Sequence, residues 1–271
     1  MRGLLTIDNN WPSSWGKKTS IMGILNITPD SFSDGGDFFN IDLALKQTEK
    51  LVLSGVDILD IGAQSTRPGA DEIGAEEEIK RLLPSLIEIR KNFPKLIISI
   101  DTYNSRVACE ALKKGANWIN DVTGGRKDKL ILDVVADFDC PYVITHSKGN
   151  SKTMDKLTFY NDLMGEIANT LKELSDIAIS KNVNKNNIIW DPGLGFAKNI
   201  DQNISILKNL DRLKSFQFPL LIGASRKRFI GEILNEENPK KRDIGSLAVS
   251  CLCAQKNIEI VRVHDVMLND Q

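Results

Sequence analysis

Short apolar runs recur along this chain, and each of them stops at a polar residue. The run at positions 188–190 shows the pattern, since it ends at Asp191 before Pro192 and Gly193 turn the chain. Runs of this length that are apolar throughout are typical of strands in a parallel sheet with both faces buried. Parallel strands need a crossover connection after each one, and segments with helical spacing fill the intervals. The alternation predicts an α/β fold.

Eight strand signals are present, which is the number in a closed (β/α)8 TIM barrel. The predicted strands are 21–25, 56–62, 96–100, 118–119, 142–145, 188–190, 220–223 and 258–261. The predicted helices are 41–52, 79–86, 107–112, 131–135, 160–178, 204–210 and 244–252. A doubly wound sheet is the alternative, but the Gly-x-Gly-x-x-Gly fingerprint that often follows its first strand is absent. We expect a barrel domain over residues 20–271, with residues 1–19 forming a hairpin that closes one end.

Composition argues against several classes of partner. The chain has 271 residues and a formal net charge of −1, which gives no electrostatic reason to bind nucleic acid or a membrane surface. No apolar run reaches the length of a membrane span, and the apolar part of the N-terminus is too short for a signal peptide. The four cysteines lack metal or disulfide spacing, which favours buried thiols in a reducing compartment. We therefore expect a cytoplasmic protein.

The polar residues at the strand ends are the candidate site. In a closed parallel barrel the carboxyl ends of the strands meet on one face, where barrel enzymes have their active sites. One such residue carries little weight, because Asp191 with Pro192 and Gly193 is turn chemistry by itself. The repetition along the chain favours function instead. The residues at these ends are Asn26, Asp101, Asn120, His146, Asp191, Lys227, Arg262 and His264.

One group of these residues suits a flat heterocycle. Asp101, Asn120 and Asp191 can accept hydrogen bonds from ring N–H and amino groups. A carboxylate in particular accepts two parallel hydrogen bonds from an amidine-like edge. Lys227 is suited to donate to a ring carbonyl. These residues predict a small-molecule site for a nitrogen heterocycle.

A second group suits phosphate. Guanidinium groups and hydroxyls bind phosphate oxygens well, and Asn26 is a candidate oxygen ligand for a Mg²⁺ ion that also holds the phosphates. The residues of this second zone are Arg67, Arg262 and His264, with Ser65 and Thr66 nearby. Together the two zones predict a heterocycle that carries a phosphate or diphosphate.

Several motifs resemble those of the dihydropteroate synthase family. Residues 24–36, ILNITPDSFSDGG, resemble the first loop of the family, and residues 65–69, STRPG, resemble its second loop. Shorter matches follow in the family's order at 100–102, 119–121, 191–196, 225–227 and 262–264. The resemblance covers nearly the whole chain from residue 20, and the two loop motifs are highly specific.

This resemblance implies a transferase of folate biosynthesis that is a target of sulfonamides. Enzymes of the family join 6-hydroxymethyl-7,8-dihydropterin diphosphate to p-aminobenzoate, with Mg²⁺ as cofactor, and release 7,8-dihydropteroate and diphosphate. Breaking the bond to diphosphate leaves a cation beside an electron-rich ring, so the enzyme has to stabilise leaving-group charge and orient an arylamine. No strong nucleophile is needed. The resemblance also implies a homodimer built on the late helices.

The resemblance assigns a role to each candidate residue. The pterin is expected against Asp101, Asn120, Asp191 and Lys227, and p-aminobenzoate against Thr66, Pro68, Phe196 and Ser225, with Lys227 beside it. The diphosphate is expected at Arg262 and His264, with Asn26 as the Mg²⁺ ligand. The expected catalytic residues are Asp34, Arg67 and Lys227, and Phe32, Asp34 and Arg67 belong to loops that close over the reacting centre.

The sequence departs from the family pattern in two places. Methionines usually flank the histidine at position 146, whereas Thr145 and Ser147 flank it here, so the pterin pocket is either altered or merely repacked. The family normally continues into an eighth helix, and little of one is expected in residues 267–271. Loss of that helix would expose the flanks of the neighbouring helices, so we expect either that the sequence is a shortened version of a longer one or that residues 1–19, with Trp11 and Trp15, cover part of the gap.

Two rival functions share parts of this pattern. A pterin-dependent methyltransferase has the pterin-binding carboxylates but no need of a diphosphate site, and residues 225–227 with 262–264 argue against it. A non-catalytic pterin-binding relative is expected to have lost loop residues, yet Asn26, Arg67 and Lys227 are all present.

Overall fold

The strands form a barrel of eight parallel strands. The computed structural model describes residues 10–28, 37–64, 72–149 and 152–270, with the backbone alone at 37–40. Their order is β6-β5-β4-β3-β2-β1-β8-β7, and a parallel bridge between Trp190 and Leu220 brings the two end strands together. The strands are β1 (Ser20–Asn26), β2 (Ile58–Gly62), β3 (Ile97–Asp101), β4 (Trp118–Asp121), β5 (Tyr142–Thr145), β6 (Ile188–Asp191), β7 (Leu221–Ile222) and β8 (Ile260–Val263). The predicted (β/α)8 barrel is confirmed.

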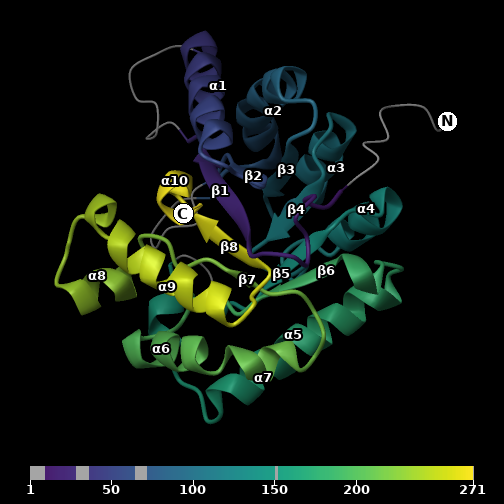
Figure 1. The fold of residues 1–271 in the computed structure, drawn as a ribbon. Coiled ribbons are helices and arrows are strands. Elements are labelled where there is room, and N and C mark those ends of the chain that lie inside the picture. Colours follow the sequence, from purple (N-terminus) through teal and green to yellow (C-terminus); the bar gives the residue numbers. More distant parts are fainter. Residues whose placement is uncertain (1–9, 29–36, 65–71, 150–151, 271) are drawn as a thin grey trace.

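Helices surround the strands (Figure 1). They are α1 (Asp37–Leu53), α2 (Ala75–Asn92), α3 (Ser105–Lys113), α4 (Leu130–Phe138), α5 (Leu163–Ser180), α6 (Ile200–Lys208), α7 (Leu210–Lys214), α8 (Arg228–Leu234), α9 (Asp243–Gln255) and α10 (Val266–Asn269). In the part of the chain that the structure describes, no helix is long and apolar enough to cross a membrane.

Three helical segments differ from the prediction. The helix predicted at 160–178 begins at Leu163, because the Asp162 side chain caps it by accepting from the Gly165 N–H at 3.1 Å. The single helix predicted at 204–210 is the pair α6 and α7. The helix α8 was not predicted, since a helix of seven residues is too short to show a helical period.

The strand pattern produces two separate apolar layers. Alternate side chains of a strand point to opposite faces, so each strand has residues for the barrel interior and residues for the helices. The larger layer lies between strands and helices. The inner layer takes one residue from each strand, namely Met22, Ile58, Ile97, Trp118, Val143, Ile189, Leu221 and Ile260.

The N-terminal segment closes the amino end of the barrel. Trp11 and Trp15 pack on the inner layer, with their ring centroids 5.0 Å and 6.1 Å from that of Trp118. The described part of the segment contains a turn, with the Trp15 N–H donating to the Pro12 oxygen at 2.9 Å, whereas the rest of the predicted hairpin, residues 1–9, lies outside the described residues. The two tryptophans therefore lie below the barrel and do not cover the flanks of the late helices.

The helix α10 packs on β1. Val266 is buried, and a Cβ atom added to Gly23 would lie 3.0 Å from Val266 Cγ2 and 2.8 Å from Val56 Cγ2. Glycine at position 23 thus lets the helix approach the strand closely. Asp265 caps α10 by accepting from the Leu268 N–H at 3.0 Å. The segment after β8 covers the first strand with one short helix, beside which α1 keeps Ala44 buried.

Candidate functional site

A tier of polar side chains lies directly above the inner apolar layer. Two residues further along a strand the side chain again points inward, and at this height most strands carry a polar group. The tier contains Asp60, Ser99, Asn120, Thr145, Asp191 and Arg262. The barrel interior is therefore apolar toward the amino ends of the strands and polar toward their carboxyl ends, where the sequence placed the site.

Arg262 joins two carboxylates at the centre of this tier. Its Nε donates to Asp60 Oδ2 at 2.6 Å and its Nη2 donates to Asp101 Oδ2 at 2.8 Å. Asn120 Nδ2 donates to the same Asp60 oxygen at 3.1 Å. Burial raises the pKa of Asp101 to about 7 although Arg262 opposes the shift. The two predicted zones therefore meet at Arg262, whose guanidinium contacts a predicted acceptor of the heterocycle, Asp101.

Asp191 is held by the turn that follows it. Its Oδ1 accepts from the Gly193 N–H at 2.7 Å. Gly193 has φ +68°, and a Cβ atom there would collide with the carbonyl oxygen of His146, so only glycine fits. Burial raises the pKa of Asp191, and Lys227 partly offsets the shift. The turn is thus both a chain reversal and the support of the carboxylate.

Lys227 and Phe196 lie together beside Asp191. The Lys227 ammonium lies 4.6 Å from the Phe196 ring centroid and donates to the Leu194 carbonyl oxygen. Burial lowers the pKa of Lys227 to about 8, an effect that the nearby Asp191 carboxylate partly offsets. The Asp191 and Asp101 carboxylates both raise the pKa of Lys227 against the effect of burial, so these predicted pterin residues lie near the same ammonium group.

Ser225 and His264 form a pair. Ser225 Oγ accepts from the His264 backbone N–H at 3.1 Å and lies 3.0 Å from His264 Nδ1. One hydroxyl therefore lies within hydrogen-bond distance of both His264 nitrogens. Ser225 was predicted to line the p-aminobenzoate site, and its bonds also give it the task of orienting His264.

Asn26 lies at the carboxyl end of β1, near Asp101. A Cβ atom built on Gly62 would lie 3.5 Å from Asn26 Oδ1 and 3.5 Å from Asp101 Cβ. The two side chains thus face the same point above β2. Among residues 10–28, 37–64, 72–149 and 152–270, no group of three His, Cys, Asp or Glu residues is arranged to hold a metal ion.

Two residues of the site were missed by the sequence analysis. Asp60 has a signal, because a carboxylate in the middle of an apolar strand requires a buried partner. Lys198 has none, since it lies in a polar loop. Its buried Nζ bonds to the carbonyl oxygens of Gly193 and Phe196, both at 2.9 Å, and lies 3.0 Å from His146 Nδ1. Lys198 thus ties the turn after β6 to the end of β5.

The two residues that flank His146 have different surroundings. Ser147 is fully engaged, since its Oγ accepts from Arg126 Nη2 at 2.7 Å and donates to the Val122 oxygen at 2.9 Å. Thr145 is buried, and its hydroxyl has no hydrogen-bond partner among the residues that the structure describes. Serine in place of methionine at position 147 is therefore accommodated by new hydrogen bonds. Threonine in place of methionine at position 145 instead adds a polar group to the barrel interior.

Some predicted site residues lie outside the described residues. These are Phe32, Asp34, Ser65, Thr66, Arg67 and Pro68. Of the expected catalytic residues, Lys227 is placed at the site. Of the expected p-aminobenzoate residues, Phe196 and Ser225 are placed there.

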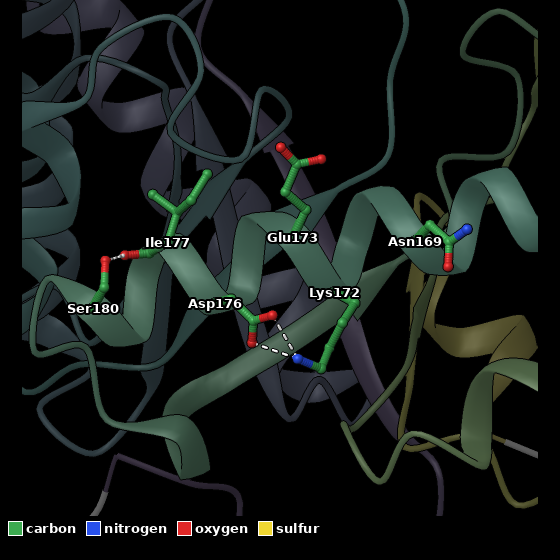
Figure 2. Close-up of a pocket in the computed structure, with 6 residues that line it drawn as sticks. All are labelled: Asn169, Lys172, Glu173, Asp176, Ile177 and Ser180. Carbon is green, nitrogen blue, oxygen red and sulfur yellow. Dashed lines mark hydrogen bonds and ion pairs between the residues drawn. The ribbon is translucent and has the colours of Figure 1, made fainter.

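A shallow hollow on the outer surface is a different feature. Figure 2 shows six lining residues, all from α5, among them Lys172 and Asp176, whose side chains pair at 2.5 Å. This surface lies on the outside of a helix and shares no residue with the polar tier. It is not the functional site.

The chain is similar to known pterin enzymes. The family described as "Pterin binding enzyme" matches residues 22–264. The dihydropteroate synthase of Synechocystis sp. is 46% identical over 252 residues, which are 93% of this chain and 87% of that protein. The family match spans the strands that carry the polar tier.

Solved structures have a similar fold. A dihydropteroate synthase from Clostridium difficile, crystallised in the presence of pteroic acid, has a TM-score of 0.88 and 44% identity over 94% of either chain. The Xanthomonas albilineans enzyme with 4-aminobenzoic acid has a TM-score of 0.87 and 38% identity, covering 93% of this chain and 90% of that one.

Proposed function

Because the chain belongs to the dihydropteroate synthase family of pterin-binding enzymes, we propose that it condenses 6-hydroxymethyl-7,8-dihydropterin diphosphate with p-aminobenzoate. The products are 7,8-dihydropteroate and diphosphate. The observation that carries the proposal is the set of polar groups at the carboxyl ends of the strands, namely the buried Asn120 and Asp191 with Asp101 and Lys227 close by. These groups match the donors and the carbonyl of a pterin ring.

The pterin lies across the carboxyl end of the barrel in this proposal. The Asp191 carboxylate accepts from the amidine-like edge of the ring, and Lys227 donates to the ring carbonyl. Asn120 uses its Nδ2 on Asp60, which leaves its amide oxygen to accept from the ring. The low-dielectric surroundings strengthen each of these hydrogen bonds.

Arg262 and His264 receive the diphosphate. Arg262 is held by Asp60 and Asp101, so its guanidinium is oriented before substrate arrives. His264 is oriented by Ser225. Preorganised donors of this kind stabilise charge that develops on a leaving group, because no reorganisation is needed during the reaction. The amine of p-aminobenzoate, held near Phe196 and Lys227, then attacks the carbon that diphosphate leaves.

Mg²⁺ is the proposed cofactor, with Asn26 as its protein ligand. Magnesium commonly keeps several waters and binds through one or two protein oxygens together with substrate phosphates. A single amide oxygen close to Asp101 fits such an ion. The ion would neutralise charge on the departing diphosphate. The test is calorimetry of diphosphate binding with and without Mg²⁺, in which Asn26→Ala is expected to lose the Mg²⁺ dependence.

The activity is tested by product formation. The protein is incubated with the pterin diphosphate and increasing p-aminobenzoate, and dihydropteroate and diphosphate are measured together. We expect equal amounts of the two products, saturation in p-aminobenzoate and inhibition by a sulfonamide. Asp101→Asn is expected to lose most of the activity, whereas Asp176→Asn on the outer face of α5 keeps it. Pterin binding without product would indicate a non-catalytic relative, and methyl transfer from methyl-tetrahydrofolate would indicate a methyltransferase.

A cytoplasmic homodimer is part of the proposal. The helix α9 buries Ser246 and Cys253 but exposes a stripe at Ile244, Ala248 and Cys251, with Ile244 76% exposed. A stripe at this spacing suits packing against a second copy. Light scattering of the wild type and of Ile244→Glu is the test, and equal masses for the two proteins would contradict this interface.

A further inference from the structure

Thr145 is the last residue of β5, and its side chain points into the barrel. Two residues earlier Val143 belongs to the inner apolar layer, whereas Ile144 belongs to the layer under the helices. Thr145 is only 1% exposed, and its Oγ1 has no hydrogen-bond partner within the described parts of the chain. A buried hydroxyl without a partner is unfavourable, so a native structure that keeps one calls for an explanation.

Its position in the barrel is next to Asp191. The Cα atoms of Thr145 and Asp191 are partners in the β5–β6 register, so the two side chains lie side by side at one height. The methyl carbon of Thr145 is on the side of the turn, since it would lie 3.3 Å from a Cβ atom on Gly193. Because the side chain as a whole points into the barrel, its hydroxyl lies at the level of the Asp191 side chain.

The order of the strands places Thr145 between two pterin-binding groups. Around the barrel, Asn120 of β4, Thr145 of β5 and Asp191 of β6 follow one another, and Lys227 lies beyond β7. A pterin presents its 2-amino group, N3–H and 4-carbonyl in this sequence along one edge. If Asp191 accepts from the amidine edge and Lys227 donates to the carbonyl, the 2-amino group lies on the β5 side of Asp191.

An amino group has two hydrogens, and the Asp191 carboxylate takes one of them together with N3–H. We propose that the Thr145 hydroxyl accepts the second hydrogen of the pterin 2-amino group, which makes Thr145 a specificity-determining residue. This inference rests on the proposed function. It explains why the barrel keeps a buried hydroxyl, because the missing partner arrives with the substrate.

The test compares two variants and two ligands by calorimetry or competition. Thr145→Val removes the hydroxyl and keeps the shape, and Thr145→Ser keeps the hydroxyl. The ligands are 6-hydroxymethylpterin and its analogue with hydrogen in place of the 2-amino group. We expect Thr145→Val to bind the pterin about fivefold to tenfold more weakly than the wild type. Thr145→Ser is expected to bind nearly as well as the wild type, and the analogue is expected not to distinguish Thr145→Val from the wild type.

One of the other buried hydroxyls, that of Ser20, provides the matched control. Ser20 Oγ also lacks a hydrogen-bond partner in the described chain, but it lies at the amino end of β1. Ser20→Ala is expected to leave the pterin affinity unchanged. Thermal unfolding is measured for every variant, and Thr145→Val is expected to melt no lower than the wild type, because its hydroxyl has no internal bond to lose. If Thr145→Val does not fold, the binding measurements are made with Thr145→Ala in its place.

Three outcomes would overturn the inference. The first is an unchanged pterin affinity in Thr145→Val, and the second is an equal loss for both ligands. The third is a clear fall in melting temperature, which would show that the hydroxyl is already bonded inside the protein. If the wild type binds no pterin at all, the proposed function fails as well. If the wild type binds the pterin and any one of these three outcomes is found, only the role of Thr145 is rejected and the proposed function stands.

Discussion

The two ends of the barrel interior use the same strands for opposite purposes. At the amino end, one apolar residue from each strand packs into a layer that Trp11 and Trp15 close. Two residues further along, the same strands carry the buried Asp60 and Asp191 and the half-buried Arg262. The lower layer needs no partner outside the protein, whereas the upper tier contains groups whose charge or hydrogen-bonding capacity is only partly used.

Burial has a different consequence at each end. Apolar side chains gain stability when they leave water. Ionisable side chains lose hydration, and their pKa values move toward the neutral form, which is why Asp101 is raised to about 7 and Lys227 is lowered to about 8. The contrast indicates that the amino end stabilises the fold and that the carboxyl end sacrifices some stability for binding.

The largest effect is expected at the amino end. Trp118 is fully buried and touches both tryptophans of the N-terminal segment. Trp118→Ala should lower the free energy of unfolding by about 3–5 kcal/mol, because it leaves a large cavity. Denaturant unfolding measures this loss, and the pterin affinity of the folded protein should change far less. An equal loss in binding would contradict the separation of the two ends.

Removal of Arg262 should affect both stability and binding. Arg262→Ala leaves Asp60 and Asp101 without their cation, which should cost about 3–4 kcal/mol of unfolding free energy. The affinity for a pterin without phosphates should fall too, because Asp101 is one of its acceptors. Adding Asp60→Asn to Arg262→Ala is the control, and it should restore part of the stability. No recovery in the double variant would argue against an unpaired carboxylate as the cause.

Asp191→Asn should weaken pterin binding with little effect on the fold. The substitution keeps the acceptor for the Gly193 N–H but removes the charge. The expected loss in binding is about 2–4 kcal/mol, as for a charged hydrogen-bond partner. Calorimetry with a pterin measures it, and an unchanged affinity would reject the assignment of Asp191 to the heterocycle.

A smaller, pH-dependent effect is expected from His146. Burial, together with Lys198, lowers the pKa of His146 from 6.5 to about 2. The unfolded histidine takes up a proton below pH 6.5 and the folded one does not, so acid favours the unfolded chain. Stability should fall by about 1.4 kcal/mol per pH unit between pH 6 and 4 on account of this group. The free energy of unfolding of His146→Asn, measured by denaturant at several pH values, should lack this slope. A slope as steep in the variant as in the wild type would assign the acid sensitivity to other residues.

The strand signals are the part of the molecule that could be predicted from the sequence. A strand of a parallel barrel is buried on both faces, so it must be apolar, and a polar residue marks its end. These are local properties, and they sufficed to place Asp101, Asn120 and Asp191 on one face. The short helix α8 and the division of α6 from α7 were not predicted, because segments of this length carry no helical period.

The partners of the polar side chains were decided by the tertiary structure alone. Arg262 lies 202 positions from Asp60 and 161 from Asp101, so no local pattern announces their contact. Lys198 likewise reaches His146 across 52 positions. Local sequence determines which residues are buried at a strand end. The closure of the barrel determines which of them meet, and therefore which charges are paired and which hydroxyls, those of Ser20, Ser99 and Thr145 among the described residues, have no partner inside the protein.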